Sequence, residues 1–365
     1  MLLSPHELQL MAVLRRQGPL SRRQLHEITR LRPNTVGDLA AKLVERGLLA
    51  EGTALAAGPG RPRVPLELDG TRRWVVGLAL RPGAIEVSRV SLRGQLRGGV
   101  EVVAVPRQRA LPEVAAEVLS RTLSPEVLAV GITTTGLLDT ETRQILLSSA
   151  LPDQRPASAE PIYEAVGDLP MRFDNDMRAL ATRWQLTHTA EPREDLLLVM
   201  VRDGAVGASL MVDGQPNRGC VVGGNELGQS HLPVGVSTMK LEAIFSTDHL
   251  LRQDPSRSGT LSERVARYTP GAGDEALVKV TGLLSLALAN AASFIRPHRL
   301  VLAGDMMQHP PFFHLVTEGM RRTMLRPVAE RMRIEAWGGP AGGATAGEDA
   351  AWLGLDLVFG DAAAT

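Results

Sequence analysis

Residues 21–47, SRRQLHEITRLRPNTVGDLAAKLVERG, predict two short helices joined by a tight turn. Ser21 and Gln24 form a capping box, in which two side chains satisfy amides left free at a helix start. Pro33 suits the first position of the second helix, because its fixed φ fits a helix there. Gly47 is typical of the residue just beyond a helix end. Two such helices near the start of a long chain favour a winged helix-turn-helix.

The second of these helices has an apolar face and a polar face. Its apolar stripe consists of Val36, Leu39, Leu43 and Val44. On the opposite face, short polar side chains can reach base edges in a major groove, while basic residues contact phosphates. We therefore predict base reading by Asn34, Thr35 and Asp38. The predicted phosphate contacts are Arg22, Arg23, Arg30, Arg32, Lys42 and Arg46.

A segment rich in Gly, Ala and Pro follows, from Gly52 to Pro65, and contains GPGRPR at 58–63. Two interpretations remain open. The segment can be a linker at a domain boundary, because Gly and Pro interrupt regular structure. Alternatively, Arg61 and Arg63 can form an extended arm that lies in a minor groove beside the helix.

The charge of the chain is distributed unevenly. All 365 residues together have 40 Lys and Arg against 40 Asp and Glu, but residues 1–73 contain 12 basic against 7 acidic residues, leaving 28 against 33 for the remainder. A basic head on an acidic body suits a head that meets nucleic acid. The length allows two or three domains, and 44% hydrophobic residues predict a sizeable core.

Composition also excludes several classes of protein. A single cysteine, Cys220, rules out an intramolecular disulfide scaffold, a cysteine-rich zinc site and an iron–sulfur centre. Cys220 itself can be a small buried apolar residue or a reactive thiol. The chain opens without a basic and apolar leader, so we expect a cytoplasmic protein. Polar residues interrupt the apolar stretch 280–295, which predicts a buried helix and no membrane span.

From Trp74 onward the pattern predicts alternating strands and helices. The first run has strands at 75–80, 84–90, 100–105 and 127–132 and a helix at 111–123. The second run has strands at 196–201, 208–212 and 299–302 and helices at 238–245, 277–295 and 312–325. These two runs predict two α/β lobes with mixed sheets.

Several motifs in this body occur together in one protein family. They are VGLALRPG at 76–83, VGITTTGLLD at 130–139, FDND at 173–176, DGAVG at 203–207, NELGQ at 225–229, LE at 241–242 and LVLAG at 300–304. By their order and spacing, residues 71–357 resemble the ROK family (repressors, open reading frames and kinases), a branch of the sugar-kinase fold shared with hexokinase and actin. With its head, the chain is similar to the family's transcriptional regulators of xylose and N-acetylglucosamine genes.

This resemblance implies an α/β body of two sugar-kinase/actin-like lobes preceded by an α+β winged helix-turn-helix domain. We expect the head, with its basic wing and linker, at 1–70. The first lobe is expected at 71–185, with a C-terminal helix at 346–360 returning to it. The second lobe, with ligand and dimerisation surfaces, is expected at 186–345.

The family resemblance also shows where the chain departs from a kinase. Ala79 stands where the family's kinases carry an aspartate near the metal-bound phosphates, and Arg81 and Pro82 replace small residues. At 202–204 the chain has Arg-Asp-Gly where kinases have Gly-Thr-Gly. A carboxylate repels phosphate, and long side chains fill the space that glycine leaves open. We therefore expect no phosphoryl transfer, no cofactor and no enzymatic activity.

The family's structural zinc site is also altered. Its cysteines are missing from the segment 232–239, and Gln229 stands where the ligand histidine would be. His231, two residues further on, cannot hold zinc alone. We therefore predict no metal.

The resemblance places a sugar site on carboxylates and amides. It implies that Asn175 and Asp176 contact two hydroxyls, Glu226 the anomeric side and Glu242 a further hydroxyl. Gln229 and His231 complete the predicted set. Simpler interpretations remain open: helix capping for Asn175 and Asp176, solvated charge for the two glutamates, and a satisfied loop residue for His231.

The sequence thus predicts a ROK-type regulator, a repressor of carbohydrate genes that binds a double-stranded DNA operator. A sugar or sugar derivative held between the lobes is expected to control it, and we expect a homodimer or homotetramer without membrane association. Two alternatives stay open: a ROK sugar kinase that carries a DNA-binding head, and a regulator that has lost its small-molecule site.

Overall fold

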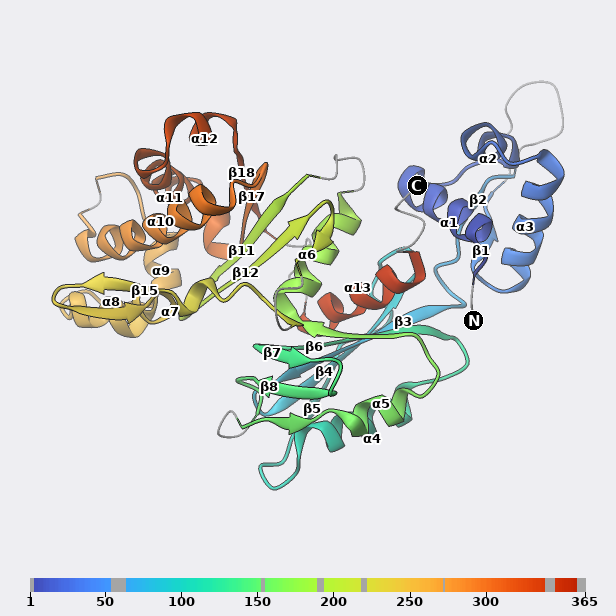
Figure 1. Ribbon diagram of the computed structural model, residues 1–365, viewed down its shortest axis with the longest axis horizontal. Helices are drawn as coiled ribbons and strands as arrows, with labels where there is room; N and C mark the ends of the chain where they lie inside the picture. The colour runs from blue at the N-terminus through green and yellow to red at the C-terminus, as the bar shows by residue number, and fades with distance from the viewer. Residues whose placement is uncertain are drawn as a thin grey trace. The chain divides into compact units, whose positions relative to one another are not determined.

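The computed structural model describes residues 3–53, 64–151, 155–188, 194–217, 222–271, 273–338 and 345–359. The chain divides into two compact units, which are described here one at a time (Figure 1). Unit 1 consists of Met1–Glu191 and Thr345–Thr365, and unit 2 of Pro192–Ala344. Cys220, Arg61 and Arg63 lie outside the described residues.

The head of unit 1 is a helical bundle with a short hairpin. It consists of α1 (Pro5–Gln17), α2 (Arg22–Thr29), α3 (Pro33–Glu45), β1 (Leu49–Glu51) and β2 (Leu66–Leu68). The predicted capping box is confirmed, because Ser21 Oγ accepts from Gln24 N and the Gln24 side chain accepts from Ser21 N. Gly47 follows α3 with φ +72°, where glycine is strongly favoured.

The interpretation of residues 52–65 as a linker between domains is wrong. β1 pairs with β2 in antiparallel register, with Leu49 opposite Leu68, and Leu66 also bridges to Leu20. Leu66 and Leu68 are buried with the helices of the head, so the chain must return to the head after this segment. The segment therefore joins the two strands of the wing.

The main sheet of unit 1 has the order β10-β6-β3-β4-β5. β3 pairs antiparallel with β4 and parallel with β6, β4 pairs antiparallel with β5, and β6 pairs parallel with β10. The strands are β3 (Trp74–Arg81), β4 (Ala84–Ser91), β5 (Glu101–Ala104), β6 (Val127–Thr134) and β10 (Met171–Asn175). The unit also contains α4 (Leu111–Thr122), β7 (Leu137–Asp139), β8 (Gln144–Leu147), β9 (Ala157–Ser158), α5 (Glu160–Val166), α6 (Asp176–Thr187) and α13 (Ala346–Phe359).

Unit 2 repeats the connectivity of that sheet. Its order is β13-β12-β11-β17-β18, in which β11 pairs antiparallel with β12 and parallel with β17. The strands are β11 (Leu196–Arg202), β12 (Ala205–Val212), β13 (Gln215–Pro216), β17 (Arg299–Ala303) and β18 (Arg333–Trp337). Repetition of one strand arrangement in both units agrees with the two predicted α/β lobes.

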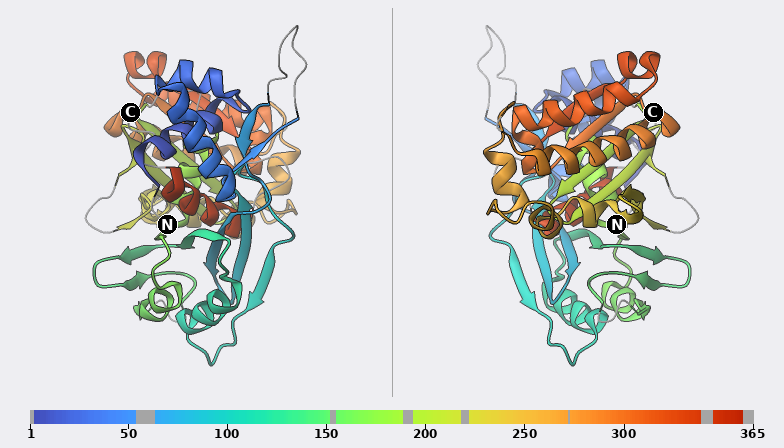
Figure 2. Two further views of the ribbon diagram at one scale, coloured as in Figure 1. Left: turned by 90° about the vertical axis from the view of Figure 1, so that its right-hand side faces the viewer. Right: turned by 90° about the vertical axis from the view of Figure 1, so that its left-hand side faces the viewer.

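The helices of unit 2 pack on this sheet and on each other. They are α7 (Leu241–Ile244), α8 (Thr247–Gln253), α9 (Leu261–Ala266), α10 (Glu275–Ile295), α11 (Pro310–Thr323) and α12 (Arg326–Arg331), with short 3₁₀ turns η2 (Leu227–Gln229) and η3 (Asp305–Gln308) and the short strand β14 (Val222–Gly223). Figure 2 shows α10 and α11, in orange, side by side within this unit. Buried residues of both helices share one core with β11 and β17.

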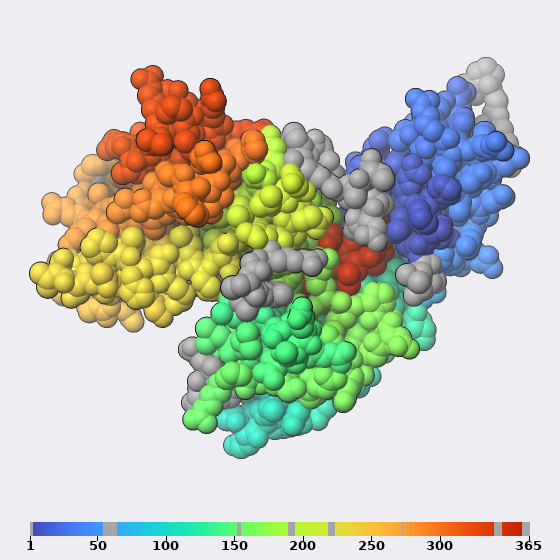
Figure 3. All heavy atoms as spheres, in the orientation of Figure 1, coloured from blue at the N-terminus to red at the C-terminus, as the bar shows by residue number. Residues whose placement is uncertain are grey.

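The predicted helix at 238–245 is confirmed only in its second half. Ser237–Lys240 is a strand, β16, which pairs with β15 (His231–Val234), and only Leu241–Ile244 is helical. Gly235, at φ +63°, provides the turn between the two strands. This hairpin lies at the surface of unit 2, in yellow in Figure 3. The segment that resembles the family's zinc site is therefore organised here by strand pairing.

The helix α10 is long and apolar enough, by length and composition, to cross a membrane. Its residues Leu277, Leu284 and Leu288 are fully buried in the core of unit 2, where α11 packs against it. Because core helices of soluble proteins meet the same criterion, we assign α10 as a core helix, in agreement with the sequence prediction.

The C-terminal helix α13 approaches two central strands of unit 1 unusually closely. Gly77 on β3 and Gly131 on β6 are direct neighbours in the sheet. A Cβ atom at Gly77 would lie 2.0 Å from the carbonyl oxygen of Gly347, and one at Gly131 would lie 1.8 Å from that of Ala350. Only glycine fits at these two positions, because the helix backbone rests directly on the sheet.

Helix α13 also holds the head through Arg15 of α1. The Arg15 guanidinium lies 4.6 Å from the ring centroid of Phe359 and 5.6 Å from that of Trp352, both on α13. Its Nη2 donates to the carbonyl oxygen of Leu186, at the end of α6. Burial lowers the pKa of Arg15 to about 10, so the side chain stays charged at neutral pH and the cation–π contacts persist.

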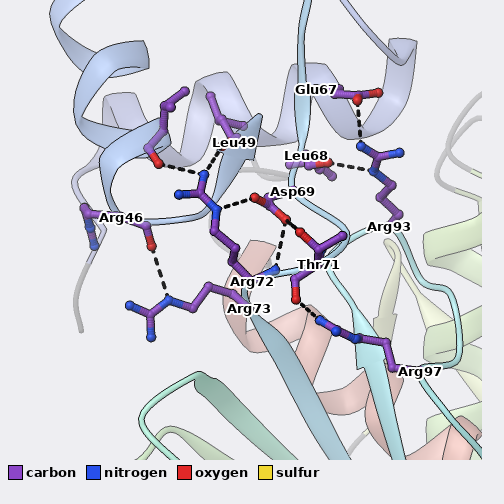
Figure 4. A network of polar contacts seen from close by, with 11 residues as sticks. Arg46, Leu49, Glu67, Leu68, Asp69, Thr71, Arg72, Arg73, Arg93 and Arg97 are labelled. Carbon is purple, nitrogen blue, oxygen red and sulfur yellow. Dashed lines mark hydrogen bonds and ion pairs between the residues drawn. The ribbon is translucent and has the colours of Figure 1, made fainter. Parts of the chain in front are cut away.

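A second set of contacts joins the head to the sheet (Figure 4). Asp69 accepts hydrogen bonds from the amides of Thr71 and Arg72 and from Arg72 Nε. Arg72 Nη2 then donates to the carbonyl oxygens of Val44 and Leu49, at 2.8 and 3.0 Å. Further arginine donors reach the carbonyl oxygens of the head: Arg73 bonds to Arg46 and Arg93 to Leu68. The head is thus fixed to the first lobe by bonds to its backbone.

We predict that Gly131→Ala destabilises the protein by about 3 kcal/mol, because the new methyl group must push α13 away from β6. Urea unfolding of the full chain, followed by circular dichroism, measures this loss. Gly99→Ala is the control, since a Cβ at Gly99 would meet nothing within 4 Å. Equal stability of the two variants would contradict the close packing of α13.

Candidate DNA-binding surface and ligand-binding residues

The predicted base-reading residues lie on the outer side of the head. Asn34 and Asp38 are exposed and Thr35 is half-buried, all in the first half of α3. Figures 1 and 2 show α3 on the side of the head that faces away from α13. The opposite face of α3 buries Val36, with Ala40 and Leu43, in the core. The helix therefore presents its polar start to solvent.

The predicted phosphate contacts have different local partners. Arg22 pairs with Glu51 of the wing at 2.7 Å, and Arg23 pairs with Glu27 at 2.8 Å. Arg30 and Arg32 are exposed at the turn between α2 and α3. Arg30 adopts the left-handed conformation, with φ +61°, which closes α2 and allows this tight turn. Arg30 and Arg32 are therefore the basic residues best placed beside the start of α3.

Arg46 has a structural role that the sequence prediction missed. Its Nη1 lies 2.8 Å from Glu7, a buried carboxylate on α1, and Lys42 Nζ lies 3.1 Å from the same oxygen. The Arg46 side chain is only 17% exposed. We therefore remove Arg46 from the set of phosphate ligands and assign it to the core of the head. The Ser4–Glu7 capping box in the sequence is the signal that could have located Glu7.

The ionisation of Glu7 is strongly perturbed. Burial acts to raise the pKa of Glu7, but hydrogen bonds from Ser4 and Lys42 and the charge of Arg46 outweigh it and lower the pKa to about 2. Since the folded state holds the charged form more tightly than the unfolded state does, Glu7 stabilises the head above its unfolded pKa near 4.5. That stabilisation is lost as the pH falls toward 2.

In unit 1, Asn175 and Asp176 stand where β10 ends and α6 begins. Asn175 is buried and caps α6: its Oδ1 accepts from Met177 N at 2.8 Å, and its Nδ2 donates to the carbonyl oxygen of Gly136 at 2.9 Å. The capping interpretation of Asn175 is therefore confirmed as a local role. Asp176, the first residue of α6, is partly exposed. Its carboxylate lies at a helix start, where negative charge is favoured.

A group of hydroxyls lies beside this helix start. Thr135 Oγ1 is 2.8 Å from Ser149 Oγ and 3.1 Å from Ser148 Oγ, and Ser148 Oγ is also 2.8 Å from Thr134 Oγ1. Gly136, which follows Thr135, links the group to Asn175. Hydroxyls, an amide and a carboxylate together offer the donors and acceptors that ring hydroxyls require.

In unit 2, the structure brings two of the predicted ligand residues together. Gln229 Nε2 donates to Glu242 Oε1 at 2.8 Å, so the amide that replaces the family's histidine orients this carboxylate. Glu226 is exposed at the start of η2, and His231 is exposed on β15, opposite Lys240. Gly228 keeps this segment against β12, because a Cβ there would lie 2.3 Å from the carbonyl oxygen of Val206.

The two loops that would hold phosphates in a kinase are occupied by the protein's own groups. Arg81 lies 3.4 Å from Glu86 across the β3–β4 hairpin, and Ala79 is buried. Asp203 accepts hydrogen bonds from the amide and the hydroxyl of Thr247 at the start of α8. The Gly204 amide donates to the carbonyl oxygen of Phe245 at 3.0 Å, so it is not free to bind a phosphate oxygen.

Within the described ranges, no group of three or more His, Cys, Asp or Glu residues is arranged to hold a metal ion.

Comparison with known proteins establishes the family. A model of the ROK family matches residues 110–353, two thirds of the sequence, and the chain belongs to this family. Its body consists of two α/β lobes of the sugar-kinase and actin type, preceded by a winged helix-turn-helix head.

The whole chain is similar to the crystal structure of a ROK family transcriptional regulator, a homologue of the E. coli MLC protein, with a TM-score of 0.73, 19% identity and 98% of each chain covered. The ROK hexokinase from Thermus thermophilus matches 78% of this chain and 99% of its own, with a TM-score of 0.61 and 23% identity. An uncharacterized protein of Sinorhizobium fredii, y4fQ, is 23% identical over 226 residues. That match covers 60% of this chain and 57% of y4fQ.

We predict that Glu7→Gln destabilises the head by on the order of 2–3 kcal/mol at pH 7, because Arg46 loses its charged partner. The difference from the wild type should shrink as the pH falls from about 4.5 toward 2, where Glu7 itself becomes protonated. Urea unfolding at pH 7 and pH 3 measures both values. Glu51→Gln, which removes an exposed ion pair, is the control and should cost less than about 1 kcal/mol. A constant penalty across this pH range would refute the depressed pKa of Glu7.

Proposed function

We propose that this protein is a sequence-specific DNA-binding transcriptional regulator whose body binds a sugar or sugar derivative. The observation that carries the proposal is the exposed polar start of α3, bordered by Arg30 and Arg32, on a head that is fixed to a ROK body. The full-length likeness to a ROK regulator supports it. We further propose that it represses carbohydrate genes.

DNA binding would use α3 in a major groove. Asn34, Thr35 and Asp38 would contact base edges, while exposed basic residues contact the phosphates on either side. In a homodimer, two copies of α3 would enter successive major grooves of one operator. The segment that joins the wing strands contains Arg61 and Arg63, which would extend these contacts into a minor groove.

Control by a sugar would act through α6. This helix starts at Asn175 and Asp176, and its far end accepts a hydrogen bond from Arg15 of the head. A ligand bound at the start of α6 would act on operator binding through this helix, provided that its affinity differs between the DNA-bound and the free protein. In unit 2, the proposed sugar contacts are Glu226, Gln229, His231 and Glu242.

A ROK sugar kinase with a DNA-binding head is the second candidate, and the likeness to the ROK hexokinase favours it. The Arg81–Glu86 pair in one loop and the bonds of Asp203 and Gly204 in the other speak against it, because these groups are engaged within the protein and the Gly204 amide is not free for a phosphate oxygen. An ATP-coupled assay over a panel of sugars tests this candidate. If the wild type phosphorylates a sugar and Asp176→Asn abolishes that turnover, the kinase replaces our proposal.

We expect the wild type to bind a duplex selected from random DNA, with affinity that falls steeply as salt rises. Arg30→Ala and Arg32→Ala should each lower the salt slope by about 1, and Asn34→Ala should relax base preference at one position. Titrations of labelled duplex at several salt concentrations give these values. Arg326→Ala, at an exposed arginine of unit 2, is the control. Absence of salt-dependent binding by the wild type would end the proposal.

We also expect at least one hexose, pentose, amino sugar or sugar phosphate to raise the thermal unfolding temperature of the wild type. Asp176→Asn and Glu242→Gln should each weaken that sugar about tenfold or more, because each removes a charged acceptor for a hydroxyl. Glu318→Gln, at a partly exposed glutamate on α11, should leave the shift unchanged. If no member of the panel shifts the wild type, the alternative of a regulator without a small-molecule site is favoured.

A further inference from the structure

Gly37 stands in the interior of α3, where the fold does not require a glycine. Its φ is not positive, and a Cβ atom added there would meet nothing within 4 Å. Glycine is less favourable than alanine inside a helix, because it loses more backbone freedom on folding. Neither packing nor backbone conformation within the described part of the chain accounts for it.

The neighbours of Gly37 on the helix surface are all short. Asn34, Gly37, Asp38 and Ala41 are spaced i, i+3, i+4 and i+7, so they form one stripe along α3. Asn34, Asp38 and Ala41 are exposed, and Gly37 is partly exposed at the border with the core. The two polar members carry their hydrogen-bonding atoms close to the helix backbone, so a base edge must come close to that backbone to be reached.

We propose that Gly37 is a positioning residue for base reading: its missing side chain lets the backbone of α3 enter a major groove deeply enough for Asn34 and Asp38 to contact base edges. This inference rests on the proposed DNA-binding function and adds to it the depth at which the helix sits. Phosphate contacts through long arginine side chains tolerate a small displacement, whereas hydrogen bonds from Asn and Asp to bases do not.

Most other glycines in helices are explained by close packing, unlike Gly37. At Gly347 and Gly319 an added Cβ would lie 2.9 and 2.7 Å from a serine Oγ, so packing explains both. Gly282, on α10 of unit 2, is exposed and has open space like Gly37. It therefore provides a matched control for the effect of a helical glycine on stability alone.

The test compares Gly37→Ala, Gly37→Gln and Gly282→Ala in the full chain. All three should keep or raise the thermal unfolding temperature, because the new residues favour helix. Affinity for the duplex selected by the wild type should fall with side-chain size at position 37, by about tenfold or more for glutamine. Affinity for duplex of random sequence should stay within about threefold, and Gly282→Ala should bind both duplexes like the wild type.

Three outcomes overturn the inference. The first is binding of the selected duplex by Gly37→Gln within about twofold of the wild type. The second is an equal loss on selected and random duplex, which would mean that the side chain hinders phosphate contact and has no part in base reading. In the third, the wild type binds neither duplex, and the proposed function then fails together with this inference; the first two leave DNA binding itself intact.

Discussion

The close packing of α13 on β3 and β6 is the constraint on which the rest of unit 1 depends. Gly77 and Gly131 let the backbone of this helix touch the sheet, and the contact brings residues 345–359 back to the first lobe. Asp349 and Asp356 of α13 form salt bridges with Arg183 and Arg172. The rings of Trp352 and Phe359, also on α13, make cation–π contacts with the buried Arg15 of the head. One helix thus organises the sheet, α6 and the head together.

The head is consequently part of unit 1, and its position is set by specific bonds. Arginines 72, 73 and 93 donate to backbone carbonyls of the head, and such bonds fix a backbone in place without depending on which side chains it carries. The buried guanidinium of Arg15 adds cation–π contacts with two aromatic rings of α13. The far end of α6, whose first residues belong to the predicted sugar site, contacts this head through the bond from Arg15 to the Leu186 carbonyl.

Local patterns in the sequence predicted much of this fold. The Ser21–Gln24 box, Pro33 and the helix stop at Gly47 all act over a few residues, so they predicted α2 and α3 correctly. The same holds for the hairpin β3–β4, whose turn contains Gly83. Prediction failed where pairing partners are distant. The linker, one of two interpretations of residues 52–65, failed because Leu66 meets Leu20 and Glu51 only in three dimensions. Residues 238–240 were assigned to a helix because β15 was not anticipated.

The sequence by itself determined the family, the two-lobed α/β body and the polar stripe on α3, since motif order and helical periodicity are properties of the linear chain. Tertiary structure alone decided which charges are structural. Arg46 and Lys42 look alike in the sequence, yet Arg46 lies nearly buried against Glu7 while most of Lys42 remains in solvent. The tertiary structure also decided that residue 131 must be a glycine and that residue 37 need not be one for folding. The reason is physical: the burial of a side chain and the close approach of two backbone segments depend on residues that are far apart along the chain.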